Sequence, residues 1–244
     1  MIIIIKFFIF DKTKDKTMYR HYFKRIIDFC FILIAIIVLI PFLVPICILL
    51  LLSGEHKIFY IQIRVGYKNN FFKMWKFATM LNGSSDIRTD ILVSGDDSRL
   101  TPVGKFLEKT KINEFPQVIN VLKGNMSIVG ARPLIETDFL KFSEPAKSMV
   151  YNTNPGITGI GSIIFRNEKR LLSETKMGMN NFYEEYIMPY KGELELWYQK
   201  NLSFWTDIKL IICTVWVLIF THSELPYKIF KGLPPKPKEL EVLY

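Results

Sequence analysis

Cysteine and histidine are scarce in this sequence, and their arrangement excludes two common kinds of structural site. The 244 residues contain three cysteines and three histidines. No two cysteines form a CxxC pair, and an odd number argues against a disulfide framework. The histidines lie far apart along the chain, so the sequence predicts no histidine metal site. We therefore expect reduced thiols and a fold that depends on packing.

Long uncharged stretches are also rare, with one exception. The segment Phe29–Leu52 carries no charged residue, and its length suffices to cross about 30 Å of hydrocarbon as a straight helix. Pro41 and Pro45 lie inside it, and each removes a helical hydrogen bond and favours a kink. The segment is too long for an ordinary core helix, and its prolines argue against a simple span.

Both flanks of this segment are basic, with Lys24 and Arg25 before it and Lys57 and Arg64 after it. A spanning helix usually shows an asymmetry of basic residues. A helix that enters the bilayer, bends at Pro41 and returns to the same face needs no asymmetry. We expect such a re-entrant helix, and an ordinary kinked transmembrane helix is the alternative.

The net charge of +9 is concentrated partly before the apolar segment, where seven basic residues precede residue 26. Basic residues beside an apolar segment face anionic headgroups, at roughly 1 kcal/mol each. The sequence has no recognisable nucleic-acid-binding motif, so membrane contact is the favoured interpretation. The apolar part of residues 1–17 is too short for a signal peptide, and these residues are either a small extra anchor or leader sequence.

The sequence predicts five regions: an N-terminal extension (1–18), the membrane helix (19–56), a mixed globular domain (57–200), an interfacial amphipathic helix (201–224) and a flexible Pro/Lys-rich tail (225–244). Within the globular domain we expect extended segments at 58–65 and 71–80, of which the second also fits an interfacial segment, a loop at 82–98, short helices at 103–110 and 115–122, and turns around 155–161. A helical stretch at 183–199 is expected to be interrupted by Pro189. The tail from residue 225 is expected to be extended and mobile because of its prolines and lysines.

The block from Asp97 to Pro133 carries the most chemical information. Glu114 precedes a helix that Pro116 starts, where the helix dipole favours an anion or a carboxylate that holds Mg²⁺. Arg132 precedes Pro133, which favours an extended backbone and can direct a guanidinium at a phosphate. Taken alone, Glu114 also fits a plain helix-start carboxylate and Arg132 a surface ion pair.

Together these motifs resemble the bacterial sugar transferases, the polyprenyl-phosphate phosphoglycosyl transferases with one re-entrant membrane helix. The resemblance covers residues 19–161 in order. The matching residues are Lys24-Arg25-x-x-Asp28, Ser53-Gly54, Tyr60, Gln62, Arg64, Gly66, Lys76–Met80, Asp97-x-Arg99-x-Thr101, Asn113-Glu114-x-Pro116-Gln117, Asn120–Ser127, Gly130–Pro133 and Pro155–Gly159.

The resemblance implies a mostly α fold with short β elements, in which a re-entrant N-terminal membrane helix and amphipathic interfacial helices surround a small cytosolic catalytic domain. It also implies transfer of a sugar-1-phosphate from a nucleotide diphosphate sugar to polyprenyl (undecaprenyl) phosphate at the cytosolic face of the bacterial inner membrane, which initiates surface glycan synthesis. Mg²⁺ is the implied cofactor, with Glu114 as its ligand, and pathway enzymes or a second copy are possible partners. The implied catalytic pair is Asn113 and Glu114, and the implied phosphate-binding residues are Arg132, Arg99 and Lys76.

This chain departs from the family pattern at four positions, which are Asn113, Ala78, Asn125 and Ala131. The first departure matters most, because the family has an aspartate nucleophile there and an amide has no anionic oxygen. Three accounts are open: direct attack by the polyprenyl phosphate, a substitute carboxylate such as Glu114 or Asp97, or a catalytically weak relative that serves as a membrane scaffold for glycan-assembly enzymes. A basic peripheral membrane protein without sugar chemistry is a further alternative. We favour an active enzyme, because Glu114, Lys76, Arg99 and Arg132 are all present.

Overall fold

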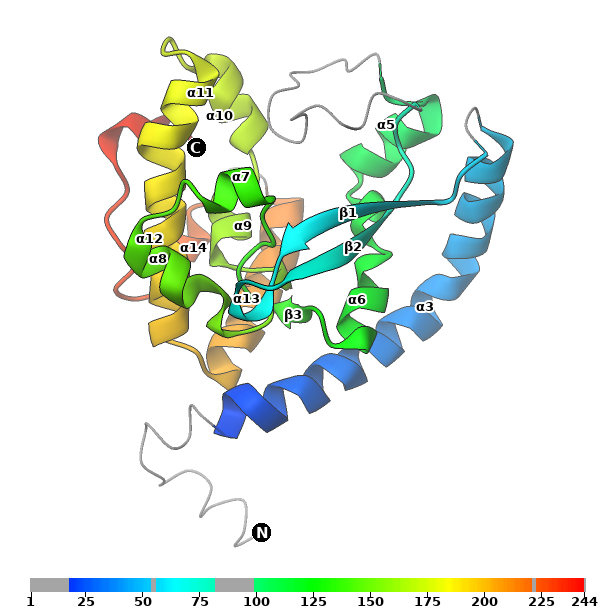
Figure 1. Ribbon diagram of the computed structural model, residues 1–244, viewed down its shortest axis with the longest axis horizontal. Helices are drawn as coiled ribbons and strands as arrows, with labels where there is room; N and C mark the ends of the chain where they lie inside the picture. The colour runs from blue at the N-terminus through cyan, green and yellow to red at the C-terminus, as the bar shows by residue number, and fades with distance from the viewer. Residues whose placement is uncertain (1–17, 54–55, 82–98, 221–222, 244) are drawn as a thin grey trace, which may run out of the picture.

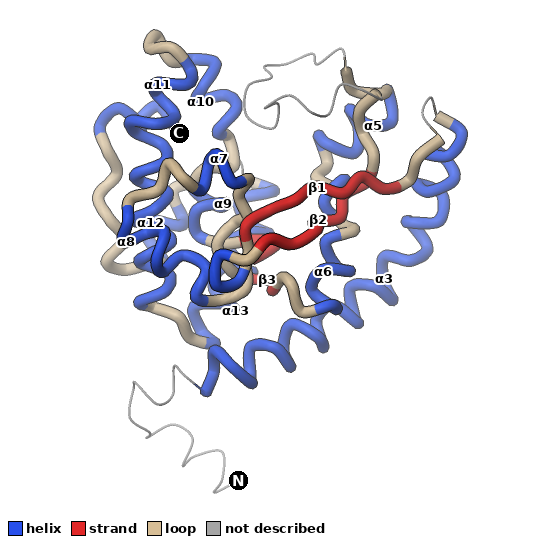
Figure 2. The backbone as a smooth tube through the Cα atoms, viewed as in Figure 1, coloured by secondary structure: helices blue, strands red, loops and turns tan. Residues whose placement is uncertain are grey.

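The computed structural model describes residues 18–53, 56–81, 99–220 and 223–243. Most of these residues are helical and the strands are short, which confirms the mostly α prediction (Figures 1 and 2). The predicted loop at 82–98, Asp97 and the N-terminal residues 1–17 lie outside the described residues. In chain order the elements are η1 (Tyr19–Phe23), α3 (Lys24–Leu52), β1 (Phe59–Val65), η2 (Tyr67–Asn69), β2 (Phe71–Phe77), α5 (Pro102–Lys109), η3 (Ile112–Glu114), α6 (Gln117–Lys123), β3 (Ser127–Val129), α7 (Glu136–Phe139), α8 (Glu144–Met149), η4 (Val150–Asn152), β4 (Gly156–Thr158), α9 (Ile160–Ile164), α10 (Glu168–Glu174), α11 (Met179–Phe182), η5 (Tyr183–Ile187), α12 (Met188–Lys200), α13 (Phe204–Ile219), α14 (Leu225–Ile229) and η6 (Lys238–Leu243).

The apolar segment forms one continuous helix, α3, with Pro41 and Pro45 inside it. Figure 1 shows this helix curving along its length, so that its first half passes α6 and its second half turns toward the start of β1. It is the one helix among the described residues that is long and apolar enough to cross a membrane. Most of its large apolar side chains are exposed, for example Ile37 at 72 %. Such a surface requires an apolar environment that the rest of the described chain does not supply.

Two small sheets lie in the body beside α3, and α6 packs against both α3 and β2 (Figure 1). β1 and β2 form an antiparallel hairpin whose register runs from Phe59 opposite Phe77 to Val65 opposite Phe71. This pairing confirms both extended segments that the sequence predicts. β3 and β4 pair in parallel, with Ser127 opposite Gly156 and Val129 opposite Thr158. β4 and α9 occupy the region predicted as turns, so that prediction is wrong.

The two predicted short helices are confirmed as α5 and α6, and local chemistry explains their ends. The hydroxyl of Thr101 accepts a hydrogen bond from the Gly104 N–H at 2.9 Å, and Pro102 follows in the first turn of α5. α6 ends at Gly124, whose φ of 86° is a conformation that suits glycine. Pro189 does not interrupt its helical stretch, because it lies in the first turn of α12 directly after the wider π-helical turn η5.

The C-terminal tail differs from the prediction of an extended, mobile segment. It contains α14 and η6, and it buries Phe230 and Leu240. The Trp197 indole donates a hydrogen bond to the Lys231 carbonyl at 3.2 Å, and the Tyr190 hydroxyl donates to the Pro234 carbonyl at 3.2 Å. These hydrogen bonds and the two buried side chains hold the tail, residues 225–243, against the body as a strap along α12.

The start of α3 is tied to the body by buried polar contacts. The Lys24 ammonium pairs with the Asp207 carboxylate of α13, and both side chains are almost fully buried. The hydroxyls of Tyr19 and Tyr198 each donate to the same carboxylate at 2.7 Å. One turn along α3, Asp28 accepts hydrogen bonds from the Ser127 hydroxyl at 2.7 Å and the Ile128 N–H at 3.1 Å. The polar end of a largely exposed helix is thus fixed to α12, α13 and β3.

We expect Lys24→Met to destabilise the fold by about 3 kcal/mol, because it leaves the Asp207 carboxylate buried without a cation. The measurement is denaturant or thermal unfolding of the detergent-solubilised full chain. The double variant Lys24→Met/Asp207→Asn removes both charges and should lose less than the single variant. Equal losses in the two variants would show that the buried charge is not the cause.

Candidate active site

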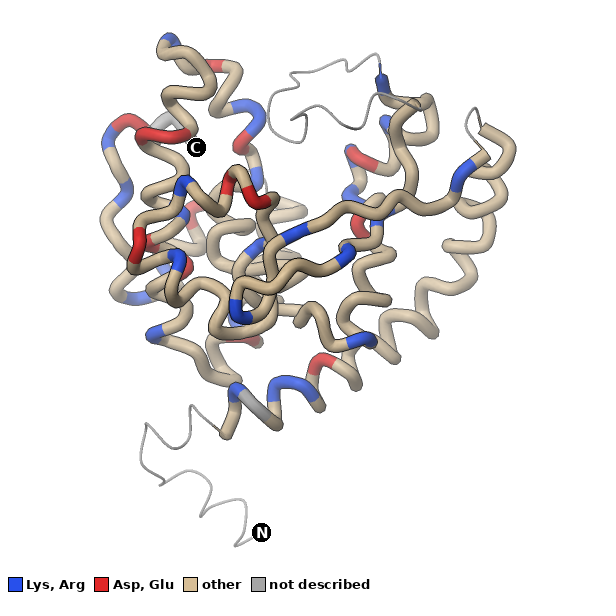
Figure 3. Tube along the Cα trace, in the orientation of Figure 1, with Lys and Arg blue, Asp and Glu red and all other residues tan. Residues whose placement is uncertain are grey.

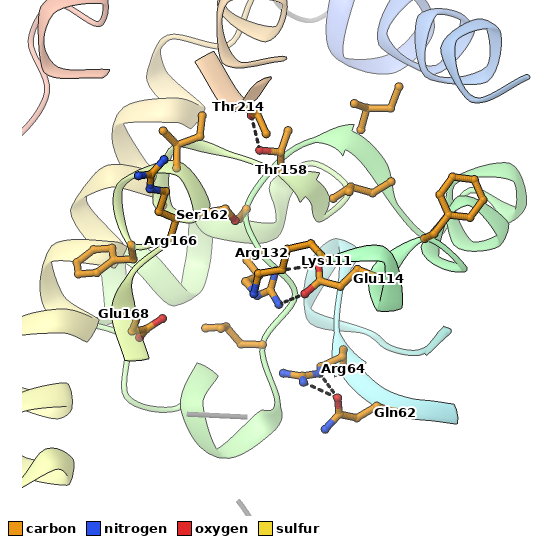
Figure 4. A pocket seen from close by; sticks show the side chains of 18 of the residues that line it. Gln62, Arg64, Lys111, Glu114, Arg132, Thr158, Ser162, Arg166, Glu168 and Thr214 are labelled. Carbon is orange, nitrogen blue, oxygen red and sulfur yellow. Dashed lines mark hydrogen bonds and ion pairs between the residues drawn. The ribbon is translucent and has the colours of Figure 1, made fainter. Parts of the chain in front are cut away.

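Glu114 and Arg132 form the centre of the candidate site (Figure 4). The Glu114 Oε1 lies 2.7 Å from Arg132 Nη2, and its Oε2 lies 3.3 Å from Nη1. The guanidinium thus meets the carboxylate with two parallel hydrogen bonds, the strongest geometry for this pair. The Gln117 amide also donates to Oε2, at 3.4 Å. The Glu114 side chain is 14 % exposed and that of Arg132 is 43 % exposed, so the arginine can reach a ligand while the glutamate stays sheltered.

The pKa of Glu114 shows which effect dominates at this site. Burial raises the pKa, but the charge and hydrogen bonds of Arg132, together with the charges of Lys76 and Lys111, outweigh burial and lower it to about 2. Glu114 is therefore ionised at neutral pH. A permanent carboxylate suits a metal ligand or an electrostatic partner, and it does not suit a general acid.

Close backbone packing places Arg132. A Cβ on Gly156 would lie 2.1 Å from the Gly130 nitrogen, so these two backbones approach each other in a way that only glycine permits. The Tyr151 hydroxyl donates to the Arg132 carbonyl at 2.8 Å and accepts from the Leu134 N–H at 2.9 Å. The segment around Arg132 is thereby held between β4 and η4.

Glu114 and Arg132 lie at the wall of a cavity of about 1230 Å³. One side of the cavity is apolar and comes largely from α3, with Phe31, Leu39 and Phe42 among its residues. The other side is polar and comes from β1, the segment around Arg132, α9 and α10. The Gln62 oxygen accepts from Arg64 Nε at 3.1 Å, and Figure 4 shows this pair below Glu114. A ligand that fills the cavity must carry both apolar and charged parts.

Of the other predicted site residues, Lys76 acts on Glu114, whereas Arg99 and Asn113 do not line the cavity. The Lys76 charge acts on Glu114, which joins β2 to the site. Arg99 lies beside the bridge between Met80 and Leu100, where its carbonyl accepts from the Leu81 N–H at 2.8 Å, and its side chain is not among the cavity-lining residues. Asn113 is 9 % exposed and also lies outside the cavity lining. Its Oδ1 is buried and has no hydrogen-bond partner among the described residues.

Sequence reasoning assigned no site role to several polar residues that line the cavity, among them Arg64, Lys111, Ser162, Lys191 and Glu195. Gln62 and Arg64 belong to the matched motifs, and their spacing of two in a strand places them on one face. The others come from segments whose proximity the sequence does not reveal.

One carboxylate is a sparse site for Mg²⁺, which prefers oxygen ligands. Among the described residues no group of three or more acidic, histidine or cysteine side chains could hold a metal ion. Both Glu114 oxygens already accept hydrogen bonds from Arg132 or Gln117. Mg²⁺ commonly binds through one or two carboxylates together with substrate phosphates and waters. Glu114 therefore fits a metal that arrives with a diphosphate, and it does not fit one held by the protein alone.

We expect the pH dependence of stability to reveal the Glu114–Arg132 pair. A lowered pKa in the folded protein stabilises it above the unfolded pKa near 4, and this contribution is lost as the pH falls toward about 2. Glu114→Gln should therefore lower the free energy of unfolding at pH 7 by about 2 kcal/mol, after allowance for the partly exposed arginine. The difference between variant and wild type should shrink steadily below pH 4.5. A constant difference from pH 7 to pH 3 would contradict the ion pair as its source.

Comparison with known proteins places these features in a family. A sequence profile of bacterial sugar transferases matches residues 19–221. The galactosyl transferase CpsE of Streptococcus agalactiae is 34 % identical over 170 residues, which are 65 % of this chain and 34 % of that protein. The sugar transferase EpsL of Bacillus subtilis is 35 % identical over 158 residues, which are 65 % of this chain and 68 % of that protein.

A relative from Klebsiella pneumoniae, named UDP-glucose:undecaprenyl-phosphate glucose-1-phosphate transferase, is 31 % identical over 200 residues, which are 79 % of this chain and 39 % of that protein. The chain thus spans less than half the length of the Streptococcus and Klebsiella relatives. The match covers η1 through α13 and includes both Glu114 and Arg132. The chain belongs to the bacterial sugar transferase family.

Proposed function

We propose that this protein transfers a sugar-1-phosphate from a UDP-sugar to undecaprenyl phosphate, as the first membrane step of surface glycan synthesis. The observation that carries the proposal is a single cavity with the Glu114–Arg132 pair on one side and the apolar helix α3 on the other. The name of the Klebsiella relative supports the substrate class.

The two sides of the cavity match the two substrates. A polyprenyl phosphate carries a long isoprenoid chain, which fits the apolar side formed by Phe31, Leu39 and Phe42. Its phosphate and the diphosphate of the donor are anionic, and they fit beside Arg132 and Lys111. The Arg132 side chain is 43 % exposed and its guanidinium has five N–H donors, so it can bind a phosphate while two of them stay with Glu114.

The transfer proceeds by direct attack of the lipid phosphate. Its oxygen forms a bond to the sugar-bearing phosphorus of the donor, the bond from that phosphorus to the bridging oxygen breaks, and UMP leaves with the electron pair. Asn113 has no anionic oxygen, and both oxygens of Glu114 are engaged by hydrogen-bond donors. Glu195 also lines the cavity, but burial raises its pKa to about 7, and a partly protonated carboxyl is a weak nucleophile.

Glu114 and Arg132 act on charge in this reaction. The guanidinium stabilises the negative charge on the transferring phosphoryl oxygens, and Glu114 holds the guanidinium in place through two hydrogen bonds. Glu114 would hold a Mg²⁺ ion that arrives with the donor, and the metal would offset negative charge on the diphosphate.

The helix α3 lies in the membrane as a re-entrant helix with Pro41 near its bend, in the bacterial inner membrane, with the active site on the cytosolic side. α13 lies in the interface: it buries Asp207, Leu210 and Cys213 at helical spacing while Ile212 and Val215 face outward. This arrangement keeps the cavity at headgroup level, where a lipid phosphate meets a soluble nucleotide.

The purified protein in detergent should convert labelled UDP-glucose or UDP-galactose, undecaprenyl phosphate and Mg²⁺ into a lipid-extractable labelled product. Glu114→Gln should lower the rate by at least 10²-fold, because Arg132 loses its charged partner and the donor loses its metal ligand. Absence of turnover over a broad panel of UDP-sugars would overturn the proposal and favour a scaffold role.

Direct attack also predicts when UMP is released in this assay. Wild-type protein should release UMP from the donor only when undecaprenyl phosphate is present, and intact-mass measurement should find no phospho-sugar adduct. Asn113→Asp restores a carboxylate at this position and should retain activity or raise it. Acceptor-independent UMP release by the wild type would show that one of its own carboxylates is the nucleophile.

Labelling from the two sides of the membrane tests the path of α3. With the native cysteines replaced, Arg20→Cys and Lys57→Cys should both react with a membrane-impermeant maleimide from the same face of sealed vesicles, because a bend near Pro41 returns the helix to its starting side. Reaction from opposite faces would show that α3 spans the bilayer.

A further inference from the structure

Two polar side chains on one wall of the cavity, Ser162 and Glu195, have no role in the proposed transfer. Ser162 belongs to α9 and Glu195 to α12, and these helices pack against each other. Glu195 is 4 % exposed. Figure 4 shows Ser162 on the same wall as Arg166, next to Arg132.

Each of these side chains has a buried oxygen without a partner among the described residues, the Oγ of Ser162 and the Oε2 of Glu195. A buried polar atom without a hydrogen bond costs about 1–3 kcal/mol. Two polar pairs on the same wall are satisfied: Lys191 pairs with Glu168 at 2.6 Å, and the hydroxyls of Thr158 and Thr214 lie 2.8 Å apart. The unpartnered oxygens therefore call for a bound group that supplies hydrogen bonds.

The position of Glu195 is closely defined. A Cβ on Gly161 would lie 2.5 Å from Glu195 Oε1, so the carboxyl lies tightly against the backbone of α9. The Gly161 N–H also donates a hydrogen bond to this carboxyl. One oxygen is thus occupied by the backbone, and the other is left to a ligand. A serine hydroxyl is equally suited to a ligand, because it rotates about one torsion and both donates and accepts.

The unpartnered oxygen of Glu195 favours a ligand that donates a hydrogen bond. A sugar hydroxyl donates such a bond, and an ionised phosphate does not. The cations Arg166, Lys169 and Arg170 also line this wall, and the Lys191 cation pairs with Glu168. Phosphate groups also fit beside Arg132 and Lys111, and an isoprenoid chain fits along α3. The sugar of the donor is covalently linked to the diphosphate, so it must lie close to the diphosphate site.

We propose that Ser162 and Glu195 form the subsite for the sugar of the donor, with Ser162 Oγ and Glu195 Oε2 each hydrogen-bonded to a sugar hydroxyl. The subsite rests on the proposed function, since it takes the sugar of a UDP-sugar whose diphosphate lies beside Arg132. It deepens that function by naming residues that select the sugar.

Calorimetric titration of the detergent-solubilised full chain tests the subsite. The probes are UDP, UDP-glucose, UDP-galactose and UDP-N-acetylgalactosamine. Ser162→Ala and Glu195→Gln should each weaken binding of the preferred UDP-sugar by about 5–10-fold, which matches the loss of one hydrogen bond. Both variants should bind UDP within twofold of the wild type. Ser173→Ala, on the exposed face of α10, is the matched control and should change neither affinity.

Monodeoxy analogues of the preferred UDP-sugar separate a direct contact from a structural effect. If Glu195 binds one hydroxyl, the analogue without that hydroxyl should bind the wild type and Glu195→Gln equally well, because the contact is already lost. Three results with the variants would overturn the subsite: equal loss of affinity for UDP and every UDP-sugar, a loss of affinity that no deoxy analogue removes, or no change in affinity at all. The two oxygens then bind water only.

The wild type also tests the proposal. Equal affinity of the wild type for UDP and every UDP-sugar would overturn the subsite. Failure of the wild type to bind UDP or any UDP-sugar would overturn the proposed function itself.

Discussion

The contact between Lys24 and Asp207 joins two parts of the molecule that prefer different surroundings. α3 exposes most of its apolar side chains, so little of it is held by packing against the body. A helix with few buried contacts needs directional interactions to fix its orientation. The buried ion pair, the hydroxyls of Tyr19 and Tyr198, and the hydrogen bond between Asp28 and Ser127 of β3 supply them at one end. Removing a partner leaves a buried charge, which makes this orientation costly to change.

The fixed orientation of α3 determines the shape of the cavity. Because one face of α3 is also a cavity wall, the segment that carries the apolar surface takes part in forming the site. The opposite wall carries the Glu114–Arg132 pair, held in place by the close contact of Gly130 and Gly156. Arg132 is partly exposed and Glu114 is sheltered. The guanidinium can therefore contact a ligand in a place where water screens its charge less than in bulk solvent. The cavity therefore combines an apolar side and a charged side in one site.

The sequence predicted the parts of the fold that depend on local patterns. The hairpin strands, α5 and α6 follow from alternation, capping and glycine positions. Glu114 and Arg132, which the motifs single out, form a pair at the cavity wall. Ser162 and Glu195 were not identified, because they are 33 residues apart and meet only through the packing of α9 on α12. The tail was misjudged because prolines and lysines dominate its composition, whereas Phe230 and Leu240 decide its packing. The average composition of the tail therefore did not predict its structure, because a few buried apolar side chains fix it to the body.

Asn113 shows how burial and chemistry compete at one position. Its side chain is 9 % exposed and directly precedes Glu114, whose carboxylate is ionised at neutral pH. A second carboxylate here would lose hydration and face a like charge, and both effects raise its pKa and disfavour its ionised form. The neutral amide avoids that cost and leaves Arg132 paired with a single carboxylate. An amide at this position is therefore compatible with the direct transfer proposed above, which needs no protein nucleophile and depends on the Glu114–Arg132 pair.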